Sequence, residues 1–294
     1  MRRKLFQKYF PDIIFLGVPA LLFLFVILIP LVMSIFYSFT DWDGISKSVH
    51  LVGLYNYKQI FTGQTQFTKS IAFTAGMAAV NTIITMVAGV GLAALLTSHM
   101  PASGLFRSIF FLPNTLGGIV LGYIWRFIFL IGFTFLGKQI GWTFFQIEWL
   151  ASFPTAFLAL AIVSIWQSIG YVMVIMIAAL VGVPASLCES ARIDGANDWN
   201  IFTKIKLPYC MPYLTVCFFW VIAQSFKMFD LNTALTAGGP YGSTASMAFQ
   251  IYRDAFSSNQ YGLANAEGFI FFVMIFVITT FQLYLSKQKE ADLR

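Results

Sequence analysis

The stretch ESARIDGANDWNIFTKIKLP, from Glu189 to Pro208, is a polar interruption between two long apolar segments. Ser186 lies three residues ahead of Glu189, the first residue of the stretch. The spacing Ser-x-x-Glu is typical of a capping box at the start of a helix. Asp194-Gly195 offers a left-handed stop, and Asn197-Asp198 offers a new helix start with an acid at the positive end of the dipole. The pattern predicts a structured loop of helix, tight turn and helix.

The rest of the chain has the composition of a membrane protein. Apolar residues make up 59% of the 294 positions and charged residues only 10%. Six segments are apolar over roughly the 20 residues that are needed to cross the hydrocarbon. They cover residues 13–38, 70–97, 108–130, 153–181, 209–229 and 263–286. Because they lack the strict alternation of barrel strands, we expect an all-α polytopic membrane protein with six transmembrane helices.

The distribution of Lys and Arg predicts the orientation of these helices. Eleven of the 18 basic residues fall on the side that holds the N-terminal tail, the Glu189–Pro208 loop and the C-terminal tail. These eleven are Arg2, Arg3, Lys4, Lys8, Arg107, Arg192, Lys204, Lys206, Lys287, Lys289 and Arg294. The positive-inside rule therefore places both termini and the loop in the cytoplasm. The net charge of +6 follows from this topology and does not indicate a nucleic-acid surface.

Motifs for catalysis are missing from the sequence. It contains no GxxxxGK[ST] phosphate loop and no HExxH, and the two histidines, His50 and His99, are predicted on opposite sides of the membrane. Cys188, Cys210 and Cys217 have no metal-ligand spacing, so neither a metal site nor a disulfide is indicated. Energy for any transport must come from a bound partner or from an ion gradient.

The polar loop resembles the EAA loop of the membrane subunits of ABC importers, with Ser190 at the second motif position. The matching residues are Glu189, Ser190, Ala191, Asp194, Gly195, Ala196, Ile205, Leu207 and Pro208. Two other segments resemble sugar-type permeases of the maltose, multiple-sugar and glycerol-3-phosphate family. One is VGLYNY, at residues 52–57, and the other is the pattern of Phe229-Asp230 followed by Thr236, Gly238, Gly239 and Pro240.

This resemblance implies an architecture and a set of partners. It implies a five-helix type I importer core preceded by one extra helix, in the plasma membrane of a bacterium or archaeon. Residues 1–69 would form the N-terminal tail, first helix and outer loop, residues 70–286 the permease domain with its coupling loop 184–208, and residues 287–294 a cytoplasmic tail. Expected partners are a second permease subunit in a heterodimer, two ATP-binding-cassette subunits that use ATP and Mg, and an extracytoplasmic binding protein. This chain itself would bind no cofactor.

Within the loop, the resemblance implies a separate role for each anchor. The coupling helix would seat in a groove of the ATPase. Glu189 would hold it by its cap or by an ion pair, Gly195 would supply the turn, and Leu207-Pro208 would fix the start of the fifth span. A plain cytoplasmic connector with ordinary caps is the alternative.

The candidate substrate pathway consists of Gln167, Tyr171, Gln224 and Phe229, because aromatic rings stack on sugar faces and amides bind hydroxyls. Helix packing is the alternative for Gln167. Asp230 lies at the predicted outer mouth, where it would cap a helix or bind, and Gly238-Gly239-Pro240 would reverse the chain. We expect Glu267, an acid inside the sixth span, to be hydrated or to cap its helix.

Three other functions compete with the sugar importer. An ion-driven secondary transporter would need inverted repeats and buried ionisable residues. Apart from Glu267, the sequence shows neither. An ABC permease for a non-sugar solute would share the coupling loop. A membrane enzyme would need clustered His, Asp or Glu at one face, which the sequence lacks.

Overall fold

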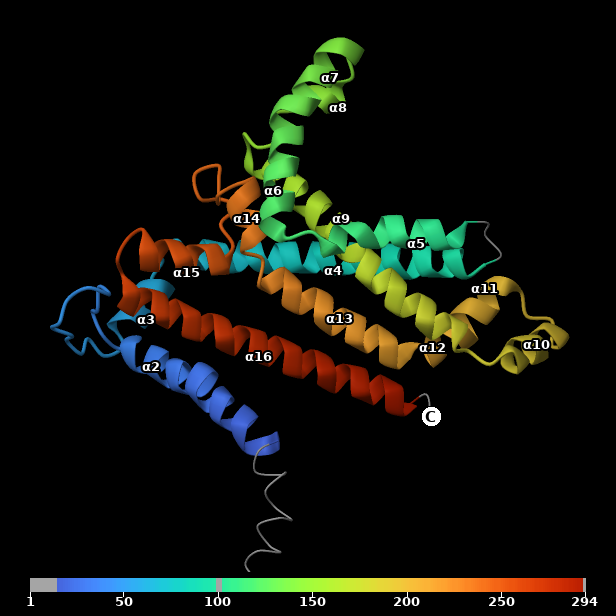
Figure 1. Ribbon diagram of the computed structural model, residues 1–294, viewed down its shortest axis with the longest axis horizontal. Helices are drawn as coiled ribbons and strands as arrows, with labels where there is room; N and C mark the ends of the chain where they lie inside the picture. The colour runs from blue at the N-terminus through green and yellow to red at the C-terminus, as the bar shows by residue number, and fades with distance from the viewer. Residues whose placement is uncertain (1–14, 99–101, 293–294) are drawn as a thin grey trace, which may run out of the picture. The chain divides into compact units, whose positions relative to one another are not determined.

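The computed structural model describes residues 15–98 and 102–292 (Figure 1). Arg2, Arg3, Lys4, Lys8, His99 and Arg294, which entered the predicted topology, lie outside these ranges. The described part is helical, apart from loops and one isolated antiparallel bridge between Thr40 and Leu51. It divides into two compact units, which we call unit 1 (residues 15–65 with Ile251–Phe272) and unit 2 (Gln66–Gln250 with residues 273–292).

The membrane-spanning helices agree with the predicted class. Five helices are long and apolar enough to cross a membrane, and a bent pair makes a sixth crossing if it is counted as one span. The five are Phe15–Tyr37, Phe67–Thr97, Gly118–Ile140, Phe153–Val181 and Tyr261–Ser286, and the pair is Asp198–Tyr209 with Met211–Phe226, bent by 72°. The all-α polytopic fold is therefore confirmed.

The third span differs from the predicted 108–130. Helix α5 (Ser103–Phe111) ends at a 3-10 turn (Leu112–Thr115), and Leu116 is extended before α6 (Gly118–Phe127) begins. Pro113 has no backbone N–H and Gly117-Gly118 follow it, so the helix breaks there. The apolar helix then runs past Trp125 and Arg126 through a π turn (Ile128–Gly132) to α7 (Phe133–Ile140). The third span therefore ends beyond residue 130, where the sequence pattern predicted its end.

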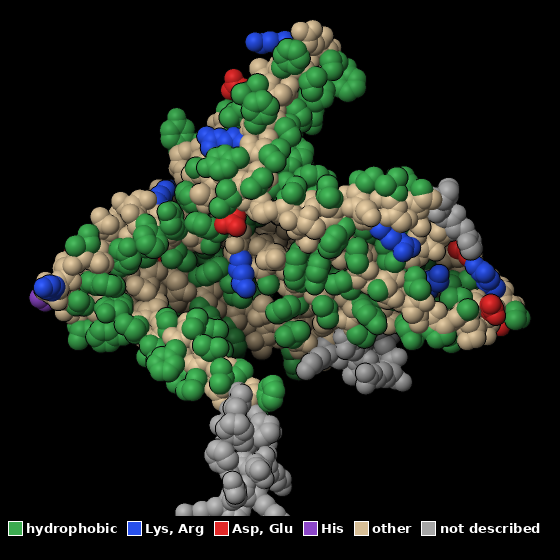
Figure 2. Space-filling view, viewed as in Figure 1, with side chains coloured by type: hydrophobic (Ala, Val, Ile, Leu, Met, Phe, Trp, Pro, Cys, Tyr) green, Lys and Arg blue, Asp and Glu red, His purple; other side chains and the backbone are tan. Residues whose placement is uncertain are grey.

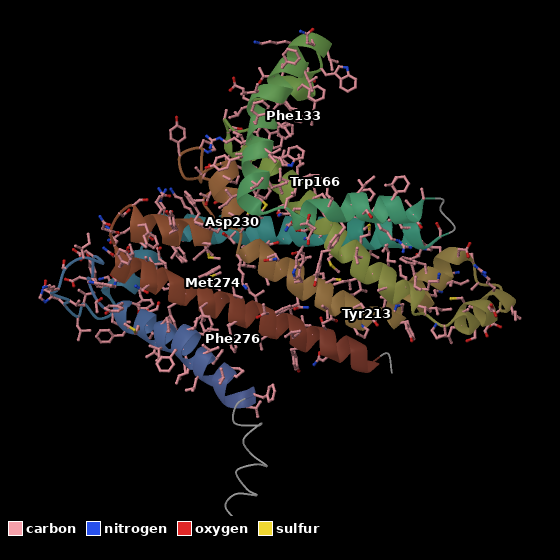
Figure 3. The ribbon with its side chains drawn as sticks, viewed as in Figure 1. Phe133, Trp166, Tyr213, Asp230, Met274 and Phe276 are labelled. Carbon is pink, nitrogen blue, oxygen red and sulfur yellow. The ribbon has the colours of Figure 1, made fainter. Side chains whose placement is uncertain are left out.

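Aromatic packing explains why this helix is longer than predicted. Phe133, labelled in Figure 3, has its ring centroid 5.4 Å from that of Phe129 and 5.1 Å from that of Phe145, which lies in α8 (Thr143–Gln146). Trp149 is buried against the same cluster. Rings from beyond the predicted end of the span therefore hold α7 and α8 together.

The centre of unit 2 is a pair of long helices, α4 (Phe67–Thr97) and α9 (Phe153–Val181), which run side by side (Figure 1). Helix α13 (Met211–Phe226) packs on both, and α5 packs on α9. Gly170 of α9 permits this last contact, because a Cβ there would strike the carbonyl oxygen of Phe110. Helix α14 (Asp230–Leu235) packs on α6, and α15 (Met247–Phe256) and α16 (Tyr261–Asp292) complete the chain.

Unit 1 gathers the outer segment around the end of α2 (Ile29–Tyr37) and the first turns of α16. The outer segment contains a short helix, α3 (Tyr55–Phe61), which begins within the VGLYNY motif. Buried Asn56 donates from Nδ2 to the carbonyl oxygens of Ser38 and Thr40, at 2.9 and 2.8 Å. The Gly262 N–H donates to the Trp42 carbonyl at 2.8 Å. These bonds connect residues 40–44 (TDWDG) and residues 52–57 (VGLYNY) to the spanning helices.

Glu267 contradicts its predicted hydration. It lies in the second turn of α16, its side chain is fully buried, and its carboxylate accepts no backbone N–H of the described residues. Its neighbour is Asp254 of α15. The prediction failed because sequence position near a helix start does not show that another helix covers the residue.

Candidate functional site

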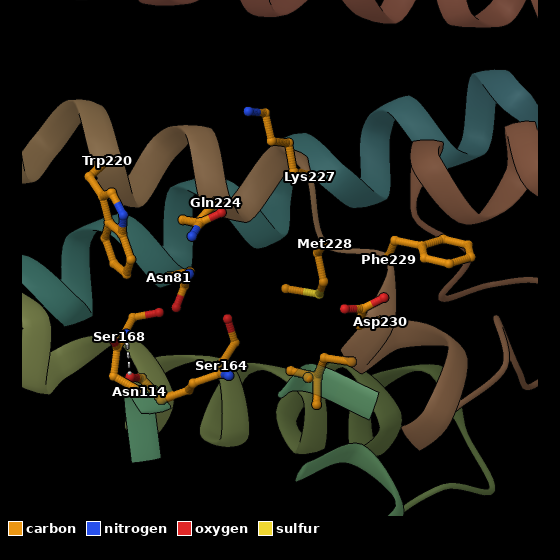
Figure 4. Close-up of a pocket in the computed structure, with 13 residues that line it drawn as sticks. Asn81, Asn114, Ser164, Ser168, Trp220, Gln224, Lys227, Met228, Phe229 and Asp230 are labelled. Carbon is orange, nitrogen blue, oxygen red and sulfur yellow. Dashed lines mark hydrogen bonds between the residues drawn. The ribbon is translucent and has the colours of Figure 1, made fainter. Parts of the chain in front are cut away.

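A cavity of about 320 Å³ lies within unit 2 and is lined mainly by amides, hydroxyls and aromatic rings (Figure 4). Its lining comprises Asn81, Asn114, Gly118, Ser164, Gln167, Ser168, Trp220, Gln224, Lys227, Met228, Phe229, Asp230 and Leu231. Three of the four predicted pathway residues are brought together here: Gln167, Gln224 and Phe229. Asp230, predicted separately at the outer mouth, joins them.

Hydrogen bonds hold several of the cavity's amides in place. Asn81 of α4 donates from Nδ2 to Ser225 Oγ at 2.7 Å. Gln167 of α9 donates from Nε2 to the Leu116 carbonyl at 3.0 Å, and Asn114 Nδ2 donates to the Gln167 carbonyl at 3.3 Å. The break between α5 and α6 is thereby tied to α9. Gln167 serves in helix packing and also lines the cavity, and its contact with a substrate stays a prediction.

Trp220 is the large aromatic side chain of this cavity, and Tyr171 stands behind it. The two rings stack with centroids 3.9 Å apart and planes at 21°. Tyr171 does not itself line the cavity, so its predicted place in the lining was wrong. Sequence reasoning missed Trp220, because a Trp on an apolar helix looks like any interfacial or packing residue.

The cavity also holds one charge of each sign, from Lys227 and Asp230. Neither side chain forms an ion pair with the described residues, and in Figure 4 Lys227 points away from the labelled amides and hydroxyls. Asp230 is the first residue of α14, but it makes no capping hydrogen bond. Capping by Asp230 was therefore a wrong prediction, and the position of its carboxylate in the cavity agrees with the binding alternative.

The Thr236–Pro240 segment is a structural turn, as predicted. Ala237 and Gly238 have φ of +49° and +75°, which turns the chain back. Buried Asn232 holds the loop after this turn in place. Its Nδ2 donates to Thr236 Oγ1 at 3.0 Å and to the Thr244 carbonyl at 2.8 Å. The Ser246 N–H donates to Asn232 Oδ1 at 3.0 Å. Gly239 and Pro240 lie within the loop. Of this predicted pattern, Phe229 and Asp230 line the cavity, whereas Thr236, Gly238, Gly239 and Pro240 do not.

The polar loop forms the predicted helix, turn and helix. Helix α10 (Ala185–Ile193) is followed by a turn at Gly195, whose φ is +84°. The Ala196 N–H donates to the Ala191 carbonyl at 2.9 Å and closes this turn. Asn197 caps α11 (Asp198–Ile201) by accepting from the Asn200 N–H at 2.8 Å. The predicted capping box was wrong, because α10 starts two residues earlier, with Pro184 at the N-cap, and neither Ser186 nor Glu189 caps it.

The second helix of the loop continues further than predicted. It runs from α11 through a π turn (Phe202–Lys206), which contains Ile205, to α12 (Leu207–Tyr209). The chain bends by 72° at Cys210, between α12 and α13. Leu207 and Pro208 therefore lie inside the helix before the bend. Pro212, in the first turn of α13, lacks the N–H that would continue the helix across the bend.

The outer surface of the loop combines exposed apolar and charged groups. Ile193 is 86% exposed and Trp199 is 71% exposed. Arg192 and Asp198 form an exposed ion pair of 3.2 Å, which connects α10 to α11. Glu189 is exposed and bonds to no described side chain. Figure 2 shows Lys, Arg, Asp and Glu side chains gathered around α10 and α11 in a surface that is largely hydrophobic elsewhere.

A helical membrane domain with a polar cavity and a projecting loop is the arrangement expected of a transport protein. Residues 85–290 match the family described as "Binding-protein-dependent transport system inner membrane component". Because this match covers more than half of the sequence, the chain belongs to that family, and it is a multi-pass membrane permease.

Two curated relatives align along nearly the whole chain. The probable starch degradation products transport system permease protein AmyD of Thermoanaerobacterium thermosulfurigenes is 40% identical over 282 residues, which is 95% of each chain. The multiple sugar-binding transport system permease protein MsmF of Streptococcus mutans is 33% identical over 288 residues, or 98% of this chain and 99% of the relative.

The fold also matches a solved structure. A chain of a bacterial ABC transporter involved in the import of the acidic polysaccharide alginate superposes with a TM-score of 0.83, covering 97% of this chain and 98% of that one. The sequence identity is 19%. At this identity the likeness concerns the fold alone, and it agrees with the family.

Proposed function

We propose that this chain is a permease subunit of a sugar ABC importer and that the 320 Å³ cavity holds part of the sugar during transport. The observation that carries the proposal is the combination of a stacked Trp220 with four side-chain amides in one cavity. Aromatic faces bind the apolar faces of sugar rings, and amides exchange hydrogen bonds with their hydroxyls. The names of the two curated relatives support this substrate class.

The cavity's charge favours a neutral substrate. Lys227 and Asp230 contribute one positive and one negative charge, and the other polar lining groups are uncharged at neutral pH. An acidic sugar would need an excess of cationic groups to replace its lost hydration. The volume lies at the low end of the roughly 300 to 1,000 Å³ of small-molecule sites. A segment of a neutral oligosaccharide fits these properties.

For coupling, we propose that α10 docks on a separate ATPase subunit. The sequence has no phosphate loop, so ATP and Mg would be bound by that partner. Exposed Ile193 and low-profile Ala191, Gly195 and Ala196 would enter a cleft of the ATPase, and unpaired Glu189 would meet a group of the partner. Closure of two ATPase subunits would then move the loop, and the bent pair at Cys210 would transmit the motion to α13.

The assembly follows from this role. The chain would pair with a second permease, forming half of the pathway in residues 70–286, and an extracytoplasmic binding protein would deliver the sugar. The excess of Lys and Arg on the side of the membrane that holds the Glu189–Pro208 loop and both tails supports a cytoplasmic position for both termini. The fold of the loop supports a docking element, because its turn and its second helix are fixed by their own backbone and cap bonds before any partner binds.

Uptake by the complete complex in proteoliposomes tests the proposal. With the binding protein outside and ATP inside, neutral oligosaccharides should accumulate and an acidic oligosaccharide should not. Accumulation driven by an ion gradient without ATP would favour the secondary transporter, for which the buried Glu267 beside Asp254 is the relevant observation. Uptake of a non-sugar solute with no sugar uptake would indicate the other ABC alternative.

A further inference from the structure

A second groove, of about 1,080 Å³, lies between the C-terminal half of α4 and the coupling loop. Its inner wall is apolar and comes from α4 and α13, with Met86, Val90 and Leu214 among its residues. Its mouth is lined by Trp199, Arg192 and Lys206. The sugar cavity shares no lining residue with it. The groove is therefore a separate site with an apolar end and a cationic end.

The charges at the mouth do not cancel. Arg192 is paired with Asp198, which also lines the groove, at 3.2 Å. Lys206 is half-buried and forms no ion pair with the described residues. One positive charge is therefore left over at the rim of an apolar space, where an anion would be stabilised.

The depth of the groove matches the edge of the membrane. The α4 wall belongs to a spanning helix that ends at Thr97, and Thr97 and Ser98 also line the groove. A Trp together with Lys and Arg is the typical set of side chains at the level of lipid headgroups. The groove thus starts in the hydrocarbon and opens among the headgroups.

We propose that this groove binds one anionic phospholipid, with its acyl chains along Val90 and Leu214 and its phosphate at Lys206 and Arg192. The leaflet follows from the cytoplasmic placement of the loop, which belongs to the proposed function. The lipid leaves the docking surface of α10 free. Cys188 and Arg192 are four residues apart on one side of the helix and line the groove, whereas Glu189 and Ile193 do not line it. The latter two are also four residues apart and share a different side of the helix. Bound there, the lipid contacts both α4 and the coupling loop.

The test uses the purified complete complex in nanodiscs of phosphatidylcholine with a minor fraction of phosphatidylglycerol. Native mass spectrometry counts the phosphatidylglycerol that stays bound after mild delipidation. The unaltered complex should retain it in preference to phosphatidylcholine, and Lys206→Gln should lower retention about fivefold or more. Lys204→Gln is the matched control, because Lys204 is two residues away and does not line the groove.

A second pair of variants tests the apolar end. Gly91 lines the groove, and a Cβ there meets nothing within 4 Å, so Gly91→Leu places its side chain in the groove without a clash at Cβ. Gly76→Leu in the same helix is the control, because its Cβ also meets nothing and it lies outside the groove. Gly91→Leu should lower retention and Gly76→Leu should not. Equal retention in all four variants, or no preference for phosphatidylglycerol, would overturn the proposal even if sugar uptake is intact.

Discussion

Tyr171 stacks on Trp220 with ring centroids 3.9 Å apart, and of these two rings only Trp220 lines the 320 Å³ cavity. The two residues come from different helices, α9 and α13. Tyr171 therefore limits the orientations open to the Trp220 ring without lining the cavity itself. On the proposed function, Trp220 would be the binding residue and Tyr171 the positioning residue.

Replacing Trp220 should weaken sugar transport strongly. Trp220→Ala removes the stacking face, and buried aromatic anchors of this kind contribute about 2 kcal/mol or more to binding, which corresponds to roughly a 30-fold rise in half-saturation. Trp220→Phe keeps a smaller face and should give an intermediate value. The measurement is the sugar concentration for half-maximal uptake in proteoliposomes at saturating binding protein. An unchanged value for Trp220→Ala would contradict the assignment of the cavity.

Tyr171 should have a smaller effect that depends on its ring and not on its hydroxyl. Aromatic pairs contribute about 0.5–1.5 kcal/mol beyond burial, so Tyr171→Leu should raise half-saturation by roughly 2- to 12-fold. Tyr171→Phe preserves the stack and should behave as the unaltered protein. In the Trp220→Ala background, Tyr171→Leu should add little, since the ring that it positions is gone. Additive effects would mean that Tyr171 acts by another route.

Gly170 should tolerate no side chain. A Cβ at this position would strike the Phe110 carbonyl and lie 2.7 Å from the Phe111 Cα, and backbone atoms cannot move aside cheaply. Gly170→Ala should therefore destabilise the α5–α9 contact by about 1–3 kcal/mol, the usual cost of overpacking. The midpoint of thermal unfolding in detergent measures this loss.

Gly76→Ala is the control for helix propensity. Its Cβ meets nothing within 4 Å, and replacing a helical Gly by Ala stabilises by about 0.5–1 kcal/mol. The two substitutions should shift the unfolding midpoint in opposite directions. A fall in both would show that the membrane-spanning helices respond to added volume in general, and not to the close approach of α5 at Gly170.

Local chemistry explains which parts of the coupling loop were predictable. Gly195 and Asn197 form their turn and cap with backbone groups at most four residues away, so their roles follow from sequence alone. The capping box at Ser186 failed because α10 begins two residues earlier, with Pro184 at the N-cap and Ala185 as its first residue. A choice between two competing starts one or two residues apart depends on small energies that a sequence pattern does not rank.

The cavity was less predictable, because its residues come together only through packing. Asn81 and Asn114 lie in separate segments, and both face Ser164 and Ser168 only because α4, α9 and the break before α6 are adjacent. The Pro113 to Gly118 sequence did carry a signal for that break. Trp220 carried none, since hydropathy does not distinguish an aromatic ring that faces lipid from one that faces a cavity.

Gly195 should be essential for docking of the ATPase but not for the fold of the permease. Its Cβ would meet nothing within 4 Å in this chain, although its φ of +84° strains any side chain. Gly195→Glu should therefore leave the chain monodisperse while ATPase co-purification falls at least tenfold. Gly63→Glu controls for backbone strain, because Gly63 has φ of +75°, equally open surroundings and a position in the outer segment. Full ATPase retention by Gly195→Glu would refute docking at this turn.

Glu189 should be required for coupling, through its charge. It is exposed on α10 and bonds to no described side chain of its own chain, so replacing it should not lower the unfolding midpoint. Glu189→Ala should lower sugar uptake per ATP hydrolysed by about tenfold, because a charge-assisted bond to the ATPase, worth roughly 1.5–3 kcal/mol, is lost. Glu189→Gln keeps the shape and removes the charge, so it should reproduce most of the defect. The ratio of uptake to hydrolysis in the same proteoliposomes measures this effect, and an unaltered ratio in both variants would leave α10 as a plain connector.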